Sequence, residues 1–409
     1  MSAFELGAPE LRRVCRDLAW ADISAMVGFK AMLPPRVTCA ELQWSGDAQG
    51  ALALDSLARM QLATAAATWC NAYDVGYEDL FLAKRSVLDW TSIMLRARAS
   101  GAKHFTFSTS GSTGARKHIR HFEDVLASEA RGWATLLQRQ PGSIAIERVV
   151  VLCPTHHIYG FIWGVLLPLA LGVPALDADL SDMPALQPGD LVVAVPDQWA
   201  WLAERKATTP GVQGISSTAA LPTDVHNQLT HPPAGTSTGG GLLTRLLQIY
   251  GSSETAGLAW RQDPACDYQL APGRSRALDG GIELQLPSGN NAAMAVQDEL
   301  TWTSETTFKL IRRADGMVQV GGHNVSPDWV ASKLQSHPLV KRAAVRLSDS
   351  RQRLKAYVVL YAAESAHDQH VVEAWARAEL PDYAYPQHFS YGGQLPTNSM
   401  GKPCDWPDA

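Results

Sequence analysis

Apolar side chains recur at helical spacing along the first hundred residues. Between residues 10 and 23, apolar side chains at positions 11, 14, 15, 18 and 19 fall on one face of a helix. Similar patterns over residues 50–63 and 86–95 predict a second and a third amphipathic helix. We therefore expect residues 1–100 to form a mostly helical N-terminal region.

Beyond residue 100, strand patterns alternate with helix patterns. Apart from Arg148, residues 148–153 are continuously apolar, as are residues 191–195, which is typical of strands in a parallel sheet that is covered on both faces. Shorter strands are predicted at residues 104–107, 213–216 and 246–250, and helices from residue 122 and at residues 160–171 and 198–205. This alternation predicts an α/β fold with layered sheets.

The pattern changes again after residue 279. Short alternating segments at residues 282–286, 299–303 and 308–311 predict a set of antiparallel strands. From residue 312 the order is strand, helix, strand, strand, helix and strand, at residues 317–320, 327–335, 342–347, 354–361, 371–380 and 388–391. We therefore predict three parts, which are the helical region at 1–100, an α/β core at 101–311 and a small α+β domain at 312–409.

The composition argues against several classes of protein. The chain has 409 residues, 46% of them apolar and 18% charged, so two or three domains with large buried cores are expected. A net charge of −5 and a pI near 6.2 argue against a nucleic-acid-binding protein. The six cysteines include no Cys-x-x-Cys pair, and no stretch of 18 apolar residues exists, which argues against a zinc site and against membrane insertion. We expect a cytoplasmic monomer or homodimer.

A run of small residues follows the predicted strand at 104–107. Seven residues from Ser108 to Gly114 are small, and Lys117 comes three residues after the second of two glycines. Small residues let several backbone N–H groups approach one anion, and the lysine adds a positive charge. The spacing differs from that of the common NTPase loop, which needs G-x-x-x-x-G-K-[ST]. A Ser/Gly-rich linker is the alternative, but the strand before and the lysine after favour a phosphate-binding loop.

Three further stretches carry candidate chemistry. Residues 154–160 (Pro-Thr-His-His-Ile-Tyr-Gly) follow a buried strand, at the position where α/β proteins bind ligands. Residues 250–255 (Tyr-Gly-Ser-Ser-Glu-Thr) also follow a strand, so Tyr250 can lie beside a base and Glu254 can hold Mg²⁺ on phosphate oxygens. Residues 395–402 end in Gly-Lys, with Lys402 in an otherwise uncharged loop. Each stretch alone could be ordinary surface, but their combination and order favour one active site.

Together, these stretches resemble the motifs of the adenylate-forming family, which includes acyl-CoA synthetases, aryl-CoA ligases and the adenylation domains of nonribosomal synthetases. The family's Thr-Ser-Gly-Ser-Thr-Gly-x-x-Lys loop falls on residues 109–117. Its Tyr-Gly-x-Thr-Glu motif falls on residues 250–254, and its Leu-Pro-x-x-x-x-Gly-Lys motif on residues 395–402. Its Gly-Arg-x-Asp hinge falls on residues 312–315, where Arg313 and Asp315 match. The resemblance covers residues 103 to about 405.

The resemblance implies a fold and a set of site residues. The fold would be a truncated adenylate-forming core with a small α+β C-terminal lid and a mostly helical N-terminal region. Lys402 and His157 would be catalytic, Glu254 would hold the metal, and Asp315 would be the hinge. His157, Tyr159 and Gly160 would contact the acid. Nucleotide contacts would come from Thr109, Ser110, Gly111, Ser112, Thr113, Gly114, Lys117, Ser217, Thr218, Ala219, Tyr250, Gly251, Ser252, Ser253, Glu305 and Arg313.

The chain departs from the family pattern at two places. The family's Thr-Gly-Asp, whose aspartate holds the ribose, has only Thr303-Ser304-Glu305 as a counterpart. The subdomain that normally precedes the phosphate loop is missing or replaced by residues 1–100. Within that region, Asp55-Ser56-Leu57 resembles the attachment motif of acyl carrier proteins, which makes Ser56 a candidate for phosphopantetheine attachment. The alternative is that Asp55 or Ser56 only caps a helix.

The implied activity is that of an ATP- and Mg²⁺-dependent acid–thiol ligase. The acid would be adenylated and then transferred to the phosphopantetheine thiol of CoA or of an acyl carrier protein. The short architecture resembles ligases of bacterial aryl-polyene or xanthomonadin pigment clusters, which implies a hydroxybenzoate-like aromatic acid. The alternative is a catalytically degenerate homologue that binds nucleotide or a carrier protein.

Overall fold

The computed structural model describes most of the chain, at residues 6–27, 35–41, 43–44, 54–109, 117–139, 144–231, 243–313, 316–348, 353–361, 366–396 and 405–407. The chain divides into two compact units. The first comprises Met1–Thr109, His118–Val296 and Trp302–Lys309, and the second comprises Ser110–Lys117, Gln297–Thr301 and Leu310–Ala409.

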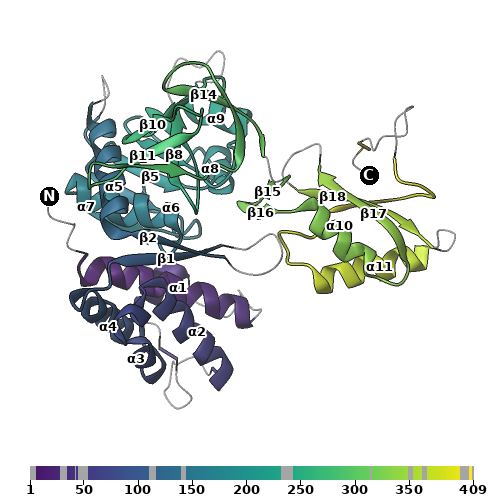
Figure 1. Cartoon of the computed structure of the whole chain (residues 1–409), viewed down its shortest axis with the longest axis horizontal. Coiled ribbons are helices and arrows are strands. Elements are labelled where there is room, and N and C mark those ends of the chain that lie inside the picture. Colours follow the sequence, from purple (N-terminus) through teal and green to yellow (C-terminus); the bar gives the residue numbers. More distant parts are fainter. Residues whose placement is uncertain are drawn as a thin grey trace. The chain divides into compact units, whose positions relative to one another are not determined.

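The N-terminal helices belong to the first unit. They are α1 (Ala8–Val27), the 3-10 turn η1 (Arg36–Glu41), α2 (Ser56–Trp69), η2 (Ala72–Val75), α3 (Glu78–Ala83) and α4 (Val87–Ala99). They gather beside the strands β1 (His104–Thr109) and β2 (Lys117–Phe122) (Figure 1). Their apolar faces share one hydrophobic core with the central sheet, so this region is continuous with the α/β core.

The starts of two of these helices have clear local causes. Asp55 caps α2, because its side chain accepts a hydrogen bond from the N–H of Ala58 at 2.8 Å. Ser86 caps α4 in the same way, accepting from the N–H of Asp89 at 3.1 Å. The three predicted N-terminal helices are thus confirmed, with the second beginning at Ser56.

The central sheet has the strand order β13-β14-β9-β8-β7-β6-β5-β3-β4. Its parallel part contains β3 (Arg148–Val151), β4 (Ala175–Asp177), β5 (Asp190–Ala194), β6 (Gln213–Ser216) and β7 (Arg245–Ser252). The strands β8 (Ala256–Arg261), β9 (Tyr268–Leu270) and β14 (Thr307–Arg313) continue it antiparallel, and β13 (Asp298–Trp302) lies at its edge.

Helices cover both faces of the parallel strands, which explains the apolar runs at residues 149–151 and 191–194. Val149 and Val151 face the core shared with α1, α4, α5 (Glu123–Arg139), α6 (Ile158–Phe161), the π-helical turn η3 (Ile162–Leu166) and α7 (Leu167–Leu171). Val150 and Val192 face a second core built with α8 (Pro196–Glu204) and α9 (Thr223–Thr230). The expected α/β layering is therefore confirmed.

Two expectations about strands need correction. Residues 117–122 form β2, paired with β1, where the sequence pattern predicts no strand, because its mostly exposed side chains leave no apolar run. The predicted antiparallel set at 282–311 is divided between two sheets. β11 (Ile282–Gln285) pairs with β10 (Arg274–Arg276) and β12 (Asn291–Met294), whereas β13 and β14 belong to the central sheet.

The second unit has its own hydrophobic core. Its elements are β15 (Val318–Val320), β16 (His323–Val325), α10 (Pro327–Gln335), β17 (Val340–Leu347), β18 (Leu354–Leu360), α11 (Ala366–Glu379) and β19 (His388–Tyr391). β17 and β18 are antiparallel, and β18 and β19 are parallel. This order follows the predicted α+β pattern. Lys355 is fully buried in this core, where its ammonium donates to the carbonyl of Trp406.

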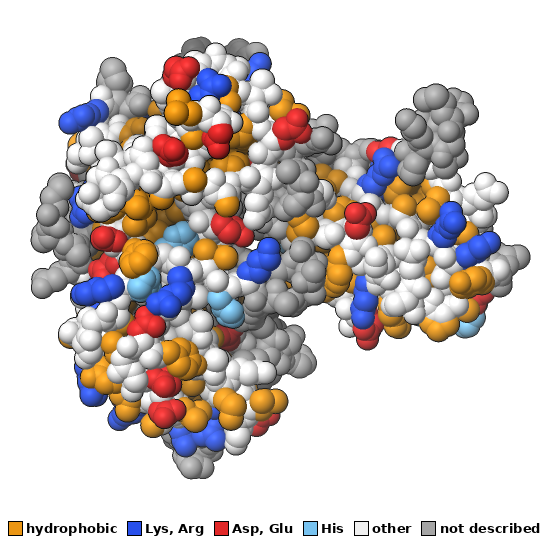
Figure 2. Space-filling view, viewed as in Figure 1, with side chains coloured by type: hydrophobic (Ala, Val, Ile, Leu, Met, Phe, Trp, Pro, Cys, Tyr) orange, Lys and Arg blue, Asp and Glu red, His pale blue; other side chains and the backbone are white. Residues whose placement is uncertain are grey.

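Surface charge and helix lengths agree with the composition. Acidic and basic side chains are interspersed on the face drawn in Figure 2, as expected for a small net charge. In the part of the chain that the structure describes, no helix is both long and apolar enough to span a bilayer.

Candidate active site

The candidate site lies where the parallel strands of the central sheet end. The register pairs Ala194 at the end of β5 with Ser216 at the end of β6, and Ser216 with Gln248 of β7. The loops that follow β3, β6 and β7 therefore leave the sheet at one edge. This edge is the usual ligand-binding edge of an open α/β sheet.

The loop after β6 is held in a strained conformation. The hydroxyl of Ser217 donates to the carbonyl of Ile249 at 2.9 Å, which ties this loop to β7. Thr218 has a φ of 79°, a region that a β-branched residue rarely adopts. The hydroxyls of Ser216 and Thr218 are buried and have no hydrogen-bond partner among the described residues. Buried polar groups normally find partners, so these two hydroxyls fit a polar ligand such as a nucleotide. Thr218 is one of the nucleotide contacts predicted from the sequence, whereas Ser216 is not.

The turn after β7 is rigid and places Glu254. A β-bulge interrupts the pairing at Tyr250 and Gly251, and a Cβ on Gly251 would lie 2.0 Å from the carbonyl oxygen of Ala256. Ser252 and Thr255 close the turn, because each backbone N–H donates to the other's hydroxyl, at 3.1 and 3.2 Å. The turn thus places partly buried Glu254 just after the end of β7, the strand to which the hydroxyl of Ser217 is tied.

The described residues contain no group of three or more His, Cys, Asp or Glu side chains that could hold a metal ion. A magnesium ion on ATP does not need such a cage, because it is commonly bound through one or two carboxylates plus substrate phosphates. Glu254 therefore remains a fitting donor for a nucleotide-bound Mg²⁺.

His121 on β2 supports this turn and was missed by sequence reasoning. Its Nε2 donates to the carbonyl of Ser253 at 2.7 Å. Burial lowers the pKa of His121, although the Ser253 carbonyl and the carboxylates of Glu129 and Glu254 oppose the shift. The only signal in the sequence was a histidine four residues after Lys117, in a segment with no apparent strand pattern.

The loop after β3 carries the predicted acid-binding residues. His157 is exposed, and its ring lies 4.1 Å from that of His156, measured between centroids. Gly160 is required for packing, since a Cβ there would lie 2.0 Å from the carbonyl oxygen of Pro154. The hydroxyl of Tyr159 donates to the carbonyls of Ala194 and Ile215, both at 3.0 Å.

Tyr159 is thus tied to the sheet. Burial raises the pKa of its hydroxyl well above the usual value, so the hydroxyl remains protonated and donates. Any contact with an acid would have to involve its ring.

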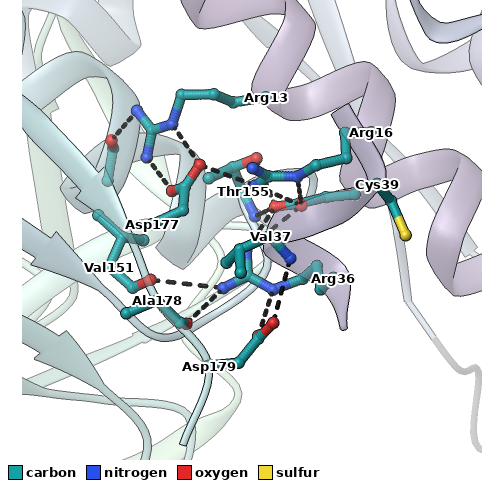
Figure 3. Close-up of polar contacts among 12 residues, drawn as sticks. Arg13, Arg16, Arg36, Val37, Cys39, Val151, Thr155, Asp177, Ala178 and Asp179 are labelled. Carbon is teal, nitrogen blue, oxygen red and sulfur yellow. Dashed lines mark hydrogen bonds and ion pairs between the residues drawn. The ribbon is translucent and has the colours of Figure 1, made fainter. Parts of the chain in front are cut away.

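A buried cluster of charges lies behind this loop (Figure 3). Three arginines of the N-terminal region, Arg13, Arg16 and Arg36, meet three aspartates. The aspartates are Asp17 on α1, Asp177 at the end of β4, and Asp179 just after it. With three charges of each sign the cluster is neutral, which reduces the cost of burying it.

The structure describes some of the other predicted site residues but not all of them. Ser110, Gly111, Ser112, Thr113, Gly114, Asp315 and Lys402 lie outside the described residues. Thr109 ends β1, Arg313 ends β14, and Lys117 begins β2 with an exposed side chain. Ala219 follows Thr218 in the loop after β6. Glu305 lies in an exposed turn, 3.5 Å from Arg276.

Comparisons with known proteins agree with this architecture. Residues 330–402 match the family model of the AMP-binding enzyme C-terminal domain. A protein of Halorhodospira halophila named 4-coumarate–CoA ligase is 34% identical over 409 residues, covering 97% of this chain and 99% of that protein. A protein of the same name from Rhodobacter capsulatus is 35% identical over 366 residues, covering 87% of this chain and 90% of that protein.

Solved structures show the same fold at lower identity. An amide bond synthetase from Marinactinospora thermotolerans matches with a TM-score of 0.56 and 17% identity, covering 96% of this chain and 92% of that one. The o-succinylbenzoate CoA synthetase of Bacillus subtilis matches with a TM-score of 0.55 and 19% identity, covering 73% of this chain and 67% of that one.

Proposed function

The chain belongs to the adenylate-forming superfamily and is an ATP-dependent acid–thiol ligase, and we propose that its acid is small and aromatic, of the hydroxybenzoate type. The observation that carries the proposal is similarity along nearly the whole chain to ligases named for an aromatic acid, 4-coumarate. The exposed ring of His157 at the ligand-binding edge of the sheet supports it. ATP and CoA as substrates favour a cytoplasmic location.

In the proposed first step, a carboxylate oxygen of the acid attacks the α-phosphorus of ATP and pyrophosphate leaves. No protein nucleophile is required, so the protein acts by positioning the reactants and neutralising charge. Lys117 and the hydroxyls around it would contact the phosphates, and Ser216 and Thr218 would face the nucleotide. Mg²⁺ held by Glu254 would offset charge on the leaving pyrophosphate. We assign Lys402 to the developing charge at the reacting phosphate.

In the proposed second step, a thiol attacks the acyl carbon of the adenylate, a thioester forms and AMP leaves. The thiol would be the phosphopantetheine of CoA or of an acyl carrier protein. Asp315 would be the hinge of the second unit between the two steps. The resemblance to pigment-cluster ligases favours the carrier protein, whereas the names of the relatives favour CoA.

Pyrophosphate release tests the proposal. The purified chain would be incubated with Mg·ATP and one acid at a time, from a panel of benzoate, 4-hydroxybenzoate, 3-hydroxybenzoate, 4-coumarate and acetate. We expect an aromatic acid to stimulate release far more than acetate. Stimulation by acetate alone would refute the aromatic assignment. So would a failure of every acid in the panel to stimulate release. Repeating the assay with CoA and with a phosphopantetheinylated carrier protein identifies the acceptor from the thioester formed.

A further inference from the structure

We propose that Asp17 and Trp69, in the N-terminal helices, are positioning residues that set the backbone of the His156–His157 loop and thereby the affinity for the acid. The proposal rests on the proposed function, because that function places His157 in the acid pocket. It gives the N-terminal region a role in substrate binding that its sequence motifs do not indicate.

Asp17 holds the first residue of this loop after Pro154. Its Oδ2 accepts two hydrogen bonds from Thr155, from the backbone N–H at 2.6 Å and from the hydroxyl at 2.7 Å. Asp17 and Thr155 both have no exposed surface. A buried carboxylate with two such bonds defines both the position of the peptide N–H and the rotamer of the side chain.

Arginines fix Asp17 in turn. Arg16 donates to its Oδ1 from Nε at 2.8 Å, and Arg36 approaches its Oδ2 at 3.1 Å. Arg36 also donates to the carbonyl of Ala178 at 2.9 Å, just beyond β4. Figure 3 shows these groups converging from α1, η1 and the ends of β3 and β4. Arg36 also donates to the carbonyls of Val151 and Leu152, both at 3.4 Å, so the carboxylate is linked through it to the end of β3, from which the loop departs.

Trp69 holds a second peptide of the loop from a different helix. At the end of α2, its indole Nε1 donates to the carbonyl of His156 at 3.0 Å. The indole is 2% exposed and packs against Phe105 and Phe161, with ring centroids 4.9 and 5.3 Å away. Its position is therefore determined by the core.

Two peptide groups of this loop, separated by one peptide, are thus held by two separate helices, one at the N–H of Thr155 and one at the C=O of His156. The next residue, His157, is exposed and caps α6 with an extended backbone. Buried ion pairs contribute little net stability compared with apolar packing, so a neutral cluster of six charges is better explained by the geometry it imposes. That geometry determines where the imidazole of His157 is presented.

The test compares two matched tryptophan substitutions. Trp69→Phe removes the hydrogen bond to the His156 carbonyl and keeps a buried ring. Trp90→Phe is the control, since Trp90 is also fully buried and donates to a backbone carbonyl, that of Phe81 at 3.1 Å, within the helical region. We expect Trp69→Phe to raise KM for the acid roughly two- to tenfold, the range for one lost hydrogen bond, with little change in KM for ATP. Trp90→Phe should change neither.

Thr155 supplies a second, independent pair. Thr155→Val removes the hydroxyl that donates a hydrogen bond to Asp17, with little change in side-chain shape. Thr155→Ser keeps that hydroxyl. KM for the acid should rise in the valine variant and return toward wild type in the serine variant. Equal KM values for the two variants, or equal effects of Trp69→Phe and Trp90→Phe, would overturn the proposal.

Hydrogen exchange separates this proposal from the function on which it rests. The amide of Thr155 should exchange slowly in the wild type. It should exchange faster in Trp69→Phe, whichever acid is the substrate, because loss of the bond at the His156 carbonyl lets the loop open more often. If no acid stimulates pyrophosphate release but this exchange pattern holds, the proposed function fails and the positioning role stands. Unchanged exchange would refute the positioning role, whatever the substrate.

Discussion

At the residue scale, the buried charges behind the His156–His157 loop respond to pH. Burial raises the pKa of Asp177, but the hydrogen bond from Arg13 and the charges of Arg13, Arg16 and Arg36 outweigh it and bring the pKa to about 2. The folded state therefore holds this carboxylate ionised at a pH where the unfolded chain would bind a proton. This difference contributes stability that is present above pH 3.8 and lost as the pH falls toward 2.

We predict that the lowered pKa of Asp177 makes the free energy of unfolding about 2 kcal/mol higher at neutral pH than below pH 2, since one pKa unit corresponds to about 1.4 kcal/mol. Urea unfolding of the wild type and of Asp177→Asn between pH 5 and pH 2 measures it. The wild type should lose more stability over this interval than the variant. Parallel pH profiles would contradict the prediction.

His121 gives a second pH-dependent prediction. Its folded pKa is lowered by burial, so the neutral ring contributes stability above the unfolded value of 6.5, and this is lost as the pH falls below it. Because the ring holds the Ser253 carbonyl, we expect His121→Phe to raise KM for Mg·ATP several-fold. His121→Gln, which keeps an N–H donor, should restore part of the affinity. Equal KM values in both variants would show that the hydrogen bond has no role.

At the element scale, the start of α2 bears on the two interpretations of Asp55-Ser56, a helix cap and a phosphopantetheine attachment motif. Asp55 is the N-cap and Ser56 is the first helical residue, so the cap explains the aspartate without a carrier-protein role. Ser56 is nevertheless exposed, and its hydroxyl accepts a hydrogen bond from Arg59 at 3.4 Å. Attachment of phosphopantetheine to Ser56 therefore remains a prediction.

We predict that Asp55→Ala lowers the free energy of unfolding by about 1 kcal/mol, because it removes the bond to the Ala58 N–H. Ser56→Ala should have a much smaller effect. Mass spectrometry after incubation with CoA and a phosphopantetheinyl transferase tests attachment. A mass gain in the wild type that Ser56→Ala abolishes would establish it, and an unmodified wild type would leave α2 a purely structural element.

At the scale of the whole molecule, the chain has two compact units with separate cores. The first contains the ligand-binding edge of the central sheet, and Lys402 belongs to the sequence of the second. The proposed function assigns the nucleotide contacts of the sheet loops to the first unit and the role of Lys402 to the second.

Lys402→Ala should therefore leave ATP binding largely intact and reduce adenylation by orders of magnitude. Binding of ATP can be followed by calorimetry and adenylation by pyrophosphate release with the best acid of the panel. Lys333→Ala is the control, because Lys333 lies on the surface of the same unit and pairs with Glu379 at 2.8 Å. Near-normal adenylation by Lys402→Ala would exclude the assigned role.

Local information was sufficient for most elements of the fold. The continuously apolar run at β3 and the amphipathic pattern at α1 predict their elements, because periodicity and burial act over a few residues. The strand β2 lacked such a pattern and was missed. The motif loops at residues 154–160 and 250–255 were also identified locally, since a loop after a buried parallel strand has a predictable place at the sheet edge.

The sequence by itself thus determined the α/β class, the ligand-binding edge and the family-like motifs. Only the tertiary structure decided what holds those motifs, because the contacts that hold the His156–His157 loop and the turn after β7 join residues 87 to 138 positions apart. Asp17 bonds Thr155 across 138 positions, and His121 bonds Ser253 across 132. No periodicity encodes such pairs. They arise when helices bury their apolar faces against the sheet, and the polar groups carried inside must then find partners.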